Sequence, residues 1–394
     1  MSSSIQGNAV SYWATEQVSP ATGVPATPVW SNIRRTSGDI DIAKSFTQSA
    51  EVDASRQPGY NIITGAEVSG AVDRDLSVAD PSLELFVRAS LQSAVGGTIS
   101  STGSTTFANS GATITQTGAF AAAVVGQYFV PFDSALNERV FTITAVTSND
   151  EVVVSPAPVD ETISTTVVGK SIRNGSSQVG VAIQKRIPTE ADTVYKTFEG
   201  CQVGSMSLSI TSGSIVTMNY AFSGLGQASG TAQIAGATDA AIDTSRVTGS
   251  VKDVIEFFVD GTPQTPADVC YTDFTLAVDN GAQSNAAIGK EGACSISFGA
   301  ANVTGTLVSY VDGTTDTTSQ SEIVKRDNET LFGLGVVLKD VDGNYLVVSM
   351  PSAQYTEVTQ ADTANGDVLK NNGSFSATGK PSGYAIEFNL IAKP

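Results

Sequence analysis

Short runs in which Val or Ile alternates with Ser or Thr recur along this chain and limit it to a mainly β fold. Residues 203–210 and 215–222 are two such runs, separated by Ser212-Gly213-Ser214. Successive side chains of a strand point to opposite faces, so each run buries one face and exposes the other. In the second run, the set Val216, Met218, Tyr220 and Phe222 is the better core candidate. The 394 residues suffice for two or three domains with sizeable cores.

The charge balance and the missing histidine exclude several classes of function. The chain has 21 Lys and Arg against 39 Asp and Glu, a net charge of −18. Such a surface repels phosphates, so we expect no basic DNA-binding face. The absence of histidine removes the commonest general base and excludes Ser-His-Asp and Cys-His catalysis. The sequence therefore predicts no catalytic residue and no enzyme.

We expect no metal site, cofactor or membrane partner. The three cysteines, Cys201, Cys270 and Cys294, form no CxxC pair and are odd in number. The run 340–344 resembles a calcium loop, but it lacks the Gly and Glu that such a loop needs, so it predicts a hairpin turn. The N-terminus lacks the pattern of a signal peptide, and uncharged stretches are too rich in Ser, Thr and Gly for membrane helices.

A strand, a long polar loop and a returning strand occupy residues 33–78, and a short helix follows. Asp80 suits the N-cap and Pro81 the first helical position. The loop carries a Ser-x-Glu-x-x-x-x-Arg-Gln run made by Ser49, Glu51, Arg56 and Gln57. This order of elements, with this run, resembles the tail tube (major tail) proteins of long-tailed, non-contractile bacteriophages.

The resemblance implies a structural virion protein of the phage tail, made in the host cytoplasm. Its copies would self-assemble into stacked rings that form the tail tube, the conduit for genome ejection. The implied partners are further copies of the chain, a tape-measure protein, tail-tip and tail-terminator proteins, and passing double-stranded DNA without sequence-specific contact. Single-domain members form sixfold rings, so two domains in one chain imply rings of three chains with pseudo-sixfold symmetry. Six chains are the alternative.

The expected fold is two tandem tail-tube β-sandwich or barrel domains, each with a short helix, plus a small inserted β domain. The run at 303–307 parallels that at 68–72 and favours this duplication. The expected boundaries are 1–32 for an extended N-terminal arm, 33–92 and 174–226 for the first domain, 93–173 for the insert on the tube exterior, 227–267 for a linker and 268–394 for the second domain.

Two groups of residues are expected at subunit contacts. Charged side chains on a loop set the register of an interface, which favours Ser49, Glu51, Arg56 and Gln57. Trp13 and Trp30 lie in the arm, and large aromatic side chains are costly to leave in water. We therefore expect both tryptophans to dock on a neighbouring surface.

Two pairs of aspartates, Asp39 with Asp41 and Asp73 with Asp75, are spaced to share a strand face. Such pairs serve glycoside hydrolysis in some enzymes, but a solvated acidic face is far commoner. In a tube this face would line the bore and repel the DNA backbone. The alternative function is a β-rich surface adhesin or decoration protein, in which the insert binds a host glycan.

Overall fold

The computed structural model describes residues 7–17, 23–50, 59–190, 192–264, 269–311, 317–361 and 368–394. Within these residues strands dominate, with two short α-helices and one 3₁₀ turn at Gly7–Ala9, so the predicted mainly β fold is confirmed. Glu51, Arg56 and Gln57 lie outside the described residues. Within the described ranges, no helix is long and apolar enough to cross a membrane.

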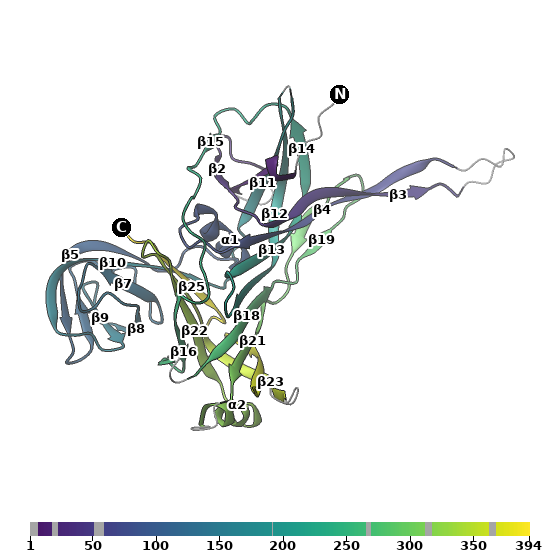
Figure 1. Cartoon of the computed structure of the whole chain (residues 1–394). Helices are drawn as coiled ribbons and strands as arrows, with labels where there is room; N and C mark the ends of the chain where they lie inside the picture. Colours follow the sequence, from purple (N-terminus) through teal and green to yellow (C-terminus); the bar gives the residue numbers. More distant parts are fainter. Residues whose placement is uncertain are drawn as a thin grey trace.

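One antiparallel sheet, here termed the central sheet, runs through both halves of the chain (Figure 1). Side chains on one face are buried, including Val72, Tyr220, Leu276 and Phe375. The other face carries mainly Ser, Thr, Asn, Asp and Ala. The strand order is β3 (Ser37–Gln48), β4 (Asn61–Asp75), β13 (Thr217–Gly224), β12 (Thr193–Thr211), β18 (Tyr271–Asp279), β21 (Asn302–Tyr310), β24 (Lys370–Ala377) and β23 (Tyr345–Ala361).

The long strands β12 and β23 each leave the central sheet and enter a second ladder, here termed an outer ladder. The first contains β2 (Val29–Asn32), β1 (Ser11–Gln17), β11 (Gly180–Pro188), the start of β12, and β14 (Gly226–Gly230). The second contains β17 (Thr262–Gln264), β16 (Val254–Val259), β22 (Phe332–Lys339), the start of β23, and β25 (Glu387–Ile391). The main hydrophobic core includes residues from the central sheet and from both outer ladders.

Six strands between residues 98 and 173 close into a small barrel (Figure 1). Its ladder runs through β5 (Thr98–Ala108), β6 (Thr113–Thr115), β9 (Glu151–Ser155), β8 (Phe141–Val146), β7 (Tyr128–Phe132) and β10 (Glu161–Arg173), which returns to β5. Phe107, Phe120, Phe129 and Phe141 fill its core.

The barrel packs on the second outer ladder. Phe132 on its β7 strand lies in one cluster with Val337 and Tyr345, and the end of β10 pairs with β25. The neighbouring residues Val336 and Leu346 belong instead to the main core. This outer ladder is therefore buried on both faces, and the barrel lies on its far side from the central sheet.

The two helices cover the core near the central sheet. Helix α1 (Pro81–Leu91) begins after Asp80, whose side chain accepts a hydrogen bond from the Ser82 amide, so the predicted cap is confirmed. The Phe86 ring of α1 lies 5.1 Å from that of Tyr220, between centroids. Helix α2 (Thr317–Asp327) packs against β23 in the second half.

The remaining strands lie between and beside the two halves. In the stretch 227–267, β15 (Thr238–Asp239) pairs in parallel with β2, and β16 and β17 join the second outer ladder. A small hairpin of β19 (Gln283–Asn285) and β20 (Ser295–Ser297) follows β18. The turn predicted at 340–344 joins β22 to β23, and the Asp340 carboxylate accepts the Asn344 amide at 2.8 Å.

Candidate subunit interface

The central sheet ends in two strand edges that have no neighbour among the described residues. Strand β3 pairs only with β4, and the end of β23, residues 354–361, pairs only with β24. An edge strand presents a row of unpaired N–H and C=O groups, which makes it a template for a strand of another chain.

Side chains of the same chain occupy two of the outward N–H groups of β3, those of Ile40 and Ile42. The Ile42 amide donates to the carboxylate of Asp41 at 2.9 Å. The Ile40 amide donates to the Tyr12 hydroxyl oxygen and to the Asp39 carboxylate. Because N–H groups of an antiparallel strand alternate in direction, Ile40 and Ile42 direct theirs to the same side, away from β4.

Two lysines hold these carboxylates in place. Lys185 Nζ lies 2.6 Å from Asp39 Oδ1, and Lys196 Nζ lies 3.4 Å from Asp41. Partial burial opposes ionisation of Asp39, but bonds from Lys185 and Tyr12 outweigh it and lower the pKa of this carboxyl. The edge of β3 is thus covered by an ionised, hydrogen-bonded cluster.

The four aspartates predicted on shared strand faces lie opposite the buried face of the central sheet. Asp39 and Asp41 alternate with buried Ile40, as Asp73 and Asp75 alternate with buried Arg74. Asn219 Nδ2 donates to Asp73 at 2.5 Å, and bonds from Ser37 and Asn219 lower the pKa of Asp73. Asp39 and Asp41 are paired with lysines of this chain. The expectation that these four aspartates line a bore stays a prediction.

On the other edge, Arg326 of α2 reaches β23. Its Nη1 donates to the carbonyl oxygen of Val358 at 2.7 Å. The same guanidinium is held by Asp327, whose Oδ1 accepts from Nη2 at 2.7 Å. An outward carbonyl of the β23 edge is therefore also occupied by a side chain of the same chain.

A buried carboxyl lies behind this edge. Glu322 of α2 is 5% exposed, and Asn371 of β24 donates to it at 3.2 Å. Burial raises the pKa of Glu322 to about 7, although bonds from Asn371 and Tyr355 and the charge of Lys325 oppose the rise. The folded chain therefore binds this proton more tightly than the unfolded chain.

Replacing Glu322 by Gln is expected to stabilise the chain in a pH-dependent manner. The pKa of this carboxyl is higher in the folded chain than in the unfolded chain. Ionisation of Glu322 therefore destabilises the fold progressively as the pH rises from the unfolded-state pKa towards the folded-state pKa of about 7. The variant should gain about 3 kcal/mol in free energy of unfolding at about pH 8 and change little at about pH 4. Urea unfolding at the two pH values measures this, and an equal effect at both would contradict the raised pKa.

The β3–β4 hairpin projects from the body of the molecule (Figure 1). Near its tip the Ser49 amide donates to the carbonyl of Tyr60 at 3.0 Å. Phe46, Tyr60 and Ile62 are 60%, 89% and 56% exposed. The sequence pattern did not predict these exposed apolar side chains, although apolar residues that alternate with polar ones beside a loop are a signal for them.

Trp13 and Trp30 both lie inside this chain. Trp30 is fully buried and Trp13 nearly so, in one cluster with Ala182 of β11. The Arg186 guanidinium lies 4.2 Å from the centroid of the Trp13 ring. The apolar surface of both indoles is therefore already covered by neighbours in the same chain, and their role in a subunit contact stays a prediction.

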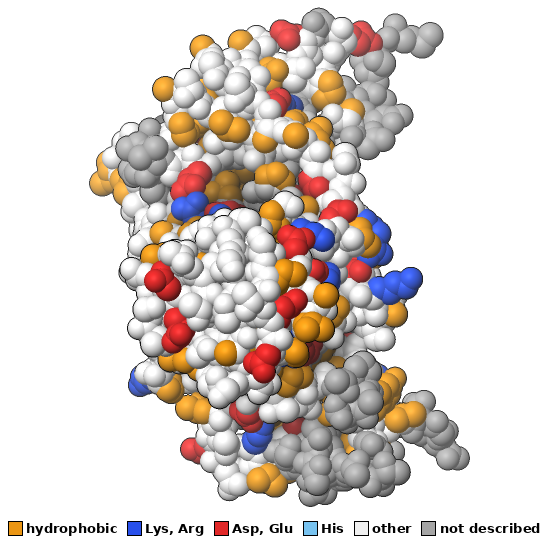
Figure 2. Space-filling model, turned by 90° about the vertical axis from the view of Figure 1, so that its left-hand side faces the viewer, with side chains coloured by type: hydrophobic (Ala, Val, Ile, Leu, Met, Phe, Trp, Pro, Cys, Tyr) orange, Lys and Arg blue, Asp and Glu red, His pale blue; other side chains and the backbone are white. Residues whose placement is uncertain are grey.

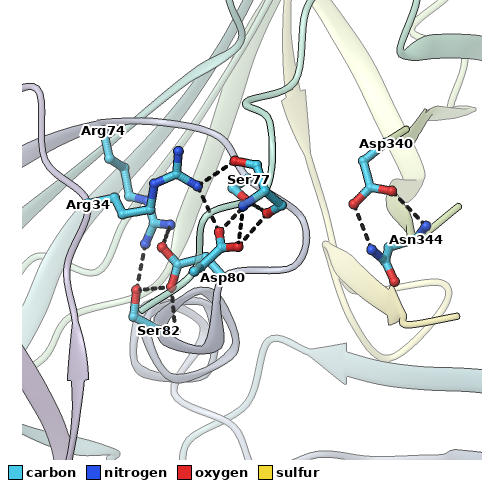
Figure 3. Close-up of polar contacts among 9 residues, drawn as sticks. Arg34, Arg74, Ser77, Asp80, Ser82, Asp340 and Asn344 are labelled. Atoms are coloured by element: carbon cyan, nitrogen blue, oxygen red, sulfur yellow. Dashed lines mark hydrogen bonds and ion pairs between the residues drawn. The ribbon is translucent and has the colours of Figure 1, made fainter. Parts of the chain in front are cut away.

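A buried ion pair fixes the junction between β4 and α1 (Figure 3). Arg74 is fully buried, pairs with Asp80 and donates from Nη1 to Ser82 Oγ at 2.9 Å. Beside it, Arg34 binds Asp243 at 2.8 Å and so ties the segment after β15 to the first half. The sequence predicts Asp80 as the helix cap but not the burial of Arg74, because an arginine in a strand gives no sign of burial.

With its mainly β fold, two open sheet edges and a projecting hairpin, this protein is suited to self-association through strand pairing. Residues 7–389 match the model of a family described as phage tail tube protein. The chain therefore belongs to the phage tail tube protein family, which confirms the resemblance found in its sequence. No curated protein matches the chain.

Membership of this family establishes the class of function. The chain is a structural, non-enzymatic protein of the phage tail, a component of the virion that self-assembles into the tail tube. The matched span, residues 7–389, includes the barrel at residues 98–173. The alternative of an adhesin or decoration protein is therefore set aside.

Proposed function

We propose that this chain forms the tail tube of a long, non-contractile phage tail as rings of three copies, each copy supplying two tandem tube domains. The proposal rests on one observation: the pairing order recurs in the two halves. Strands β1, β2, β3 and β4, helix α1 and strands β11–β14 correspond to β16, β17, β18 and β21, α2 and β22–β25. Each pairing within the first set has its counterpart in the second.

The two sets also correspond at single residues. Gly70 lies opposite Phe222, and Gly305 lies opposite Phe375. A Cβ at Gly70 would come within 2.1 Å of the Asp39 carbonyl oxygen, and one at Gly305 within 2.2 Å of that of Thr275. The same close approach of strands thus requires glycine at the same place in each half, which supports a duplication.

The junction between the halves provides a pattern for ring closure. Strand β12 of the first set pairs with β18 of the second. Their counterparts are β23 and β3, which are the two open edges of the central sheet. If β23 of one copy pairs with β3 of the next, every junction in the ring is alike, and three copies give pseudo-sixfold symmetry. The closed barrel has no exposed edge.

The polar face of the central sheet would then line the bore. Its Ser, Thr and Asp side chains, with Asp73 and Asp75 among them, would repel the DNA backbone and let it slide. The small barrel lies behind the second outer ladder, on the side away from this face, which supports a place on the tube exterior. Figure 2 looks onto that side and shows scattered acidic and basic side chains on a largely uncharged surface.

The projecting β3–β4 hairpin would contact an adjacent chain or ring. Its exposed Phe46, Tyr60 and Ile62 are apolar groups that a partner would cover. Ser49, Glu51, Arg56 and Gln57 lie in the same loop and are proposed to set the register of that contact. A tape-measure protein, tail-tip and tail-terminator proteins and passing DNA complete the proposed partners.

Electron microscopy of the concentrated full-length chain tests the proposal. Negative-stain end views should show rings with an open bore and pseudo-sixfold symmetry, and native mass spectrometry of single rings should give three copies. Rings of six copies would overturn the stoichiometry but leave the tube. The absence of rings and tubes, even with preformed tail tips added, would overturn the proposed ring.

A further inference from the structure

We propose that side chains of the free chain cap both edges of the central sheet, and that ring closure replaces these caps by main-chain hydrogen bonds in one register. In that register Val358 of one copy lies opposite Ile42 of the next. The inference rests on the proposed ring. It adds the register in which β23 of one copy pairs with β3 of the next, and it identifies the side-chain caps as a restraint on that pairing.

The register follows from the junction inside the chain. There, Met206 of β12 lies opposite Val278 of β18. Val278 corresponds to Ile42, because these residues lie opposite Val303 and Val68, the matching positions of β21 and β4.

Met206 corresponds in turn to Val358. The ladder of β12 with β13 shifts between Val203 and Ser205, and that of β23 with β24 shifts between Tyr355 and Glu357. Met206 and Val358 are each the second paired residue after this irregularity, following Ser205 and Glu357, and both side chains are buried. The intramolecular pair of Met206 with Val278 therefore predicts an intermolecular pair of Val358 with Ile42.

The main-chain groups at these two positions are complementary. Ile42 directs its N–H outward, where the Asp41 carboxylate accepts it at 2.9 Å. Val358 directs its carbonyl towards Arg326, at 2.7 Å. Opposite residues of a hydrogen-bonded antiparallel pair exchange N–H and C=O bonds. The two caps thus occupy the groups that the register pairs with each other.

The caps have the properties of a reversible restraint. The Asp41 and Lys196 side chains are 47% and 28% exposed, and exposed ion pairs of this kind are weak. Charged side chains at strand edges are a common protection against unwanted strand addition. A docked copy can therefore displace the Asp41 cap without unfolding either chain. The released groups have opposite charges, so Asp41 and Arg326 can pair across the new joint.

Assembly kinetics of the full-length chain test the restraint. Asp41→Ala and Arg326→Ala each remove one cap and are expected to shorten the lag of tube formation, followed by light scattering, by about twofold to fivefold. Asp239→Asn is the control, because it removes the charge of an aspartate that pairs with Arg186 and contacts neither edge. A lag that is unchanged or longer in both cap variants, while tubes still form, would overturn the restraint but not the tube.

Disulfide cross-linking tests the register. With the exposed Cys270 and Cys294 replaced by Ser, Ala43→Cys combined with Glu357→Cys should link neighbouring copies, because the register places these residues opposite each other with Cα atoms about 4.5 Å apart. Ala43→Cys with Thr359→Cys is the control, since its Cα atoms would lie about 7–8 Å apart, too far for a disulfide.

The cross-linking outcomes separate the inference from the ring. Covalent closed rings with the first pair and none with the control support the register. Tubes that cross-link only through the control pair, or through neither pair, overturn the register and leave the tube standing. If neither the unmodified chain nor any variant forms rings, the proposed ring fails and the register fails with it.

Discussion

Replacing Gln360 by Pro is expected to abolish rings and tubes while leaving the single chain folded. Gln360 is exposed and lies two residues beyond Val358 on the free edge of β23, so its amide points away from β24. Proline has no N–H to donate, and it is tolerated in sheets where this position faces solvent. End-view electron microscopy and sedimentation measure assembly, and circular dichroism with thermal unfolding measures the fold.

Gln360→Thr is the matched control for this variant. It removes the glutamine side chain but keeps the amide and has a high β-propensity, so tubes are expected as for the unmodified chain. Tubes formed by the proline variant would show that the end of β23 is not the ring edge. Loss of tubes in both variants would place the requirement in the side chain and not in the main chain.

Local patterns predicted the parts of this fold that local interactions determine. The alternation of Val216, Met218, Tyr220 and Phe222 predicted a buried strand face, and all four are buried. Asp80 and Pro81 marked the start of α1, because the cap needs only residues within one turn. The Asp-Gly turn between β22 and β23 followed from its own residues in the same way.

The long-range pairings left no comparable pattern. The joint of β12 with β18 links residues such as Met206 and Val278, and no short window contains both. The caps at the sheet edges were equally hidden, because Arg326 contacts a main-chain carbonyl, which every residue has. The ion pairs of Asp39 and Asp41 depend on lysines in β11 and β12, so the sequence predicted the acidic face but not its partners.

Replacing Asp80 by Ala is expected to lower the free energy of unfolding of the first half by about 3–5 kcal/mol. The change leaves the fully buried Arg74 guanidinium without its charged partner and removes the N-cap of α1. An uncompensated buried charge is far more costly than the loss of an exposed ion pair. Urea unfolding followed by tryptophan fluorescence measures the effect, because Trp13 and Trp30 are both buried in the first outer ladder of that half.

The double variant Arg74→Met with Asp80→Ser separates the two causes. Serine keeps a hydroxyl for the Ser82 amide, and methionine removes the buried charge, so the loss should be smaller than in Asp80→Ala. A loss below about 1 kcal/mol in the single variant would contradict the argument, because it would mean that other groups satisfy Arg74. Equal losses in the single and double variants would show that the ion pair itself, and not an unpaired charge, stabilises the joint between β4 and α1.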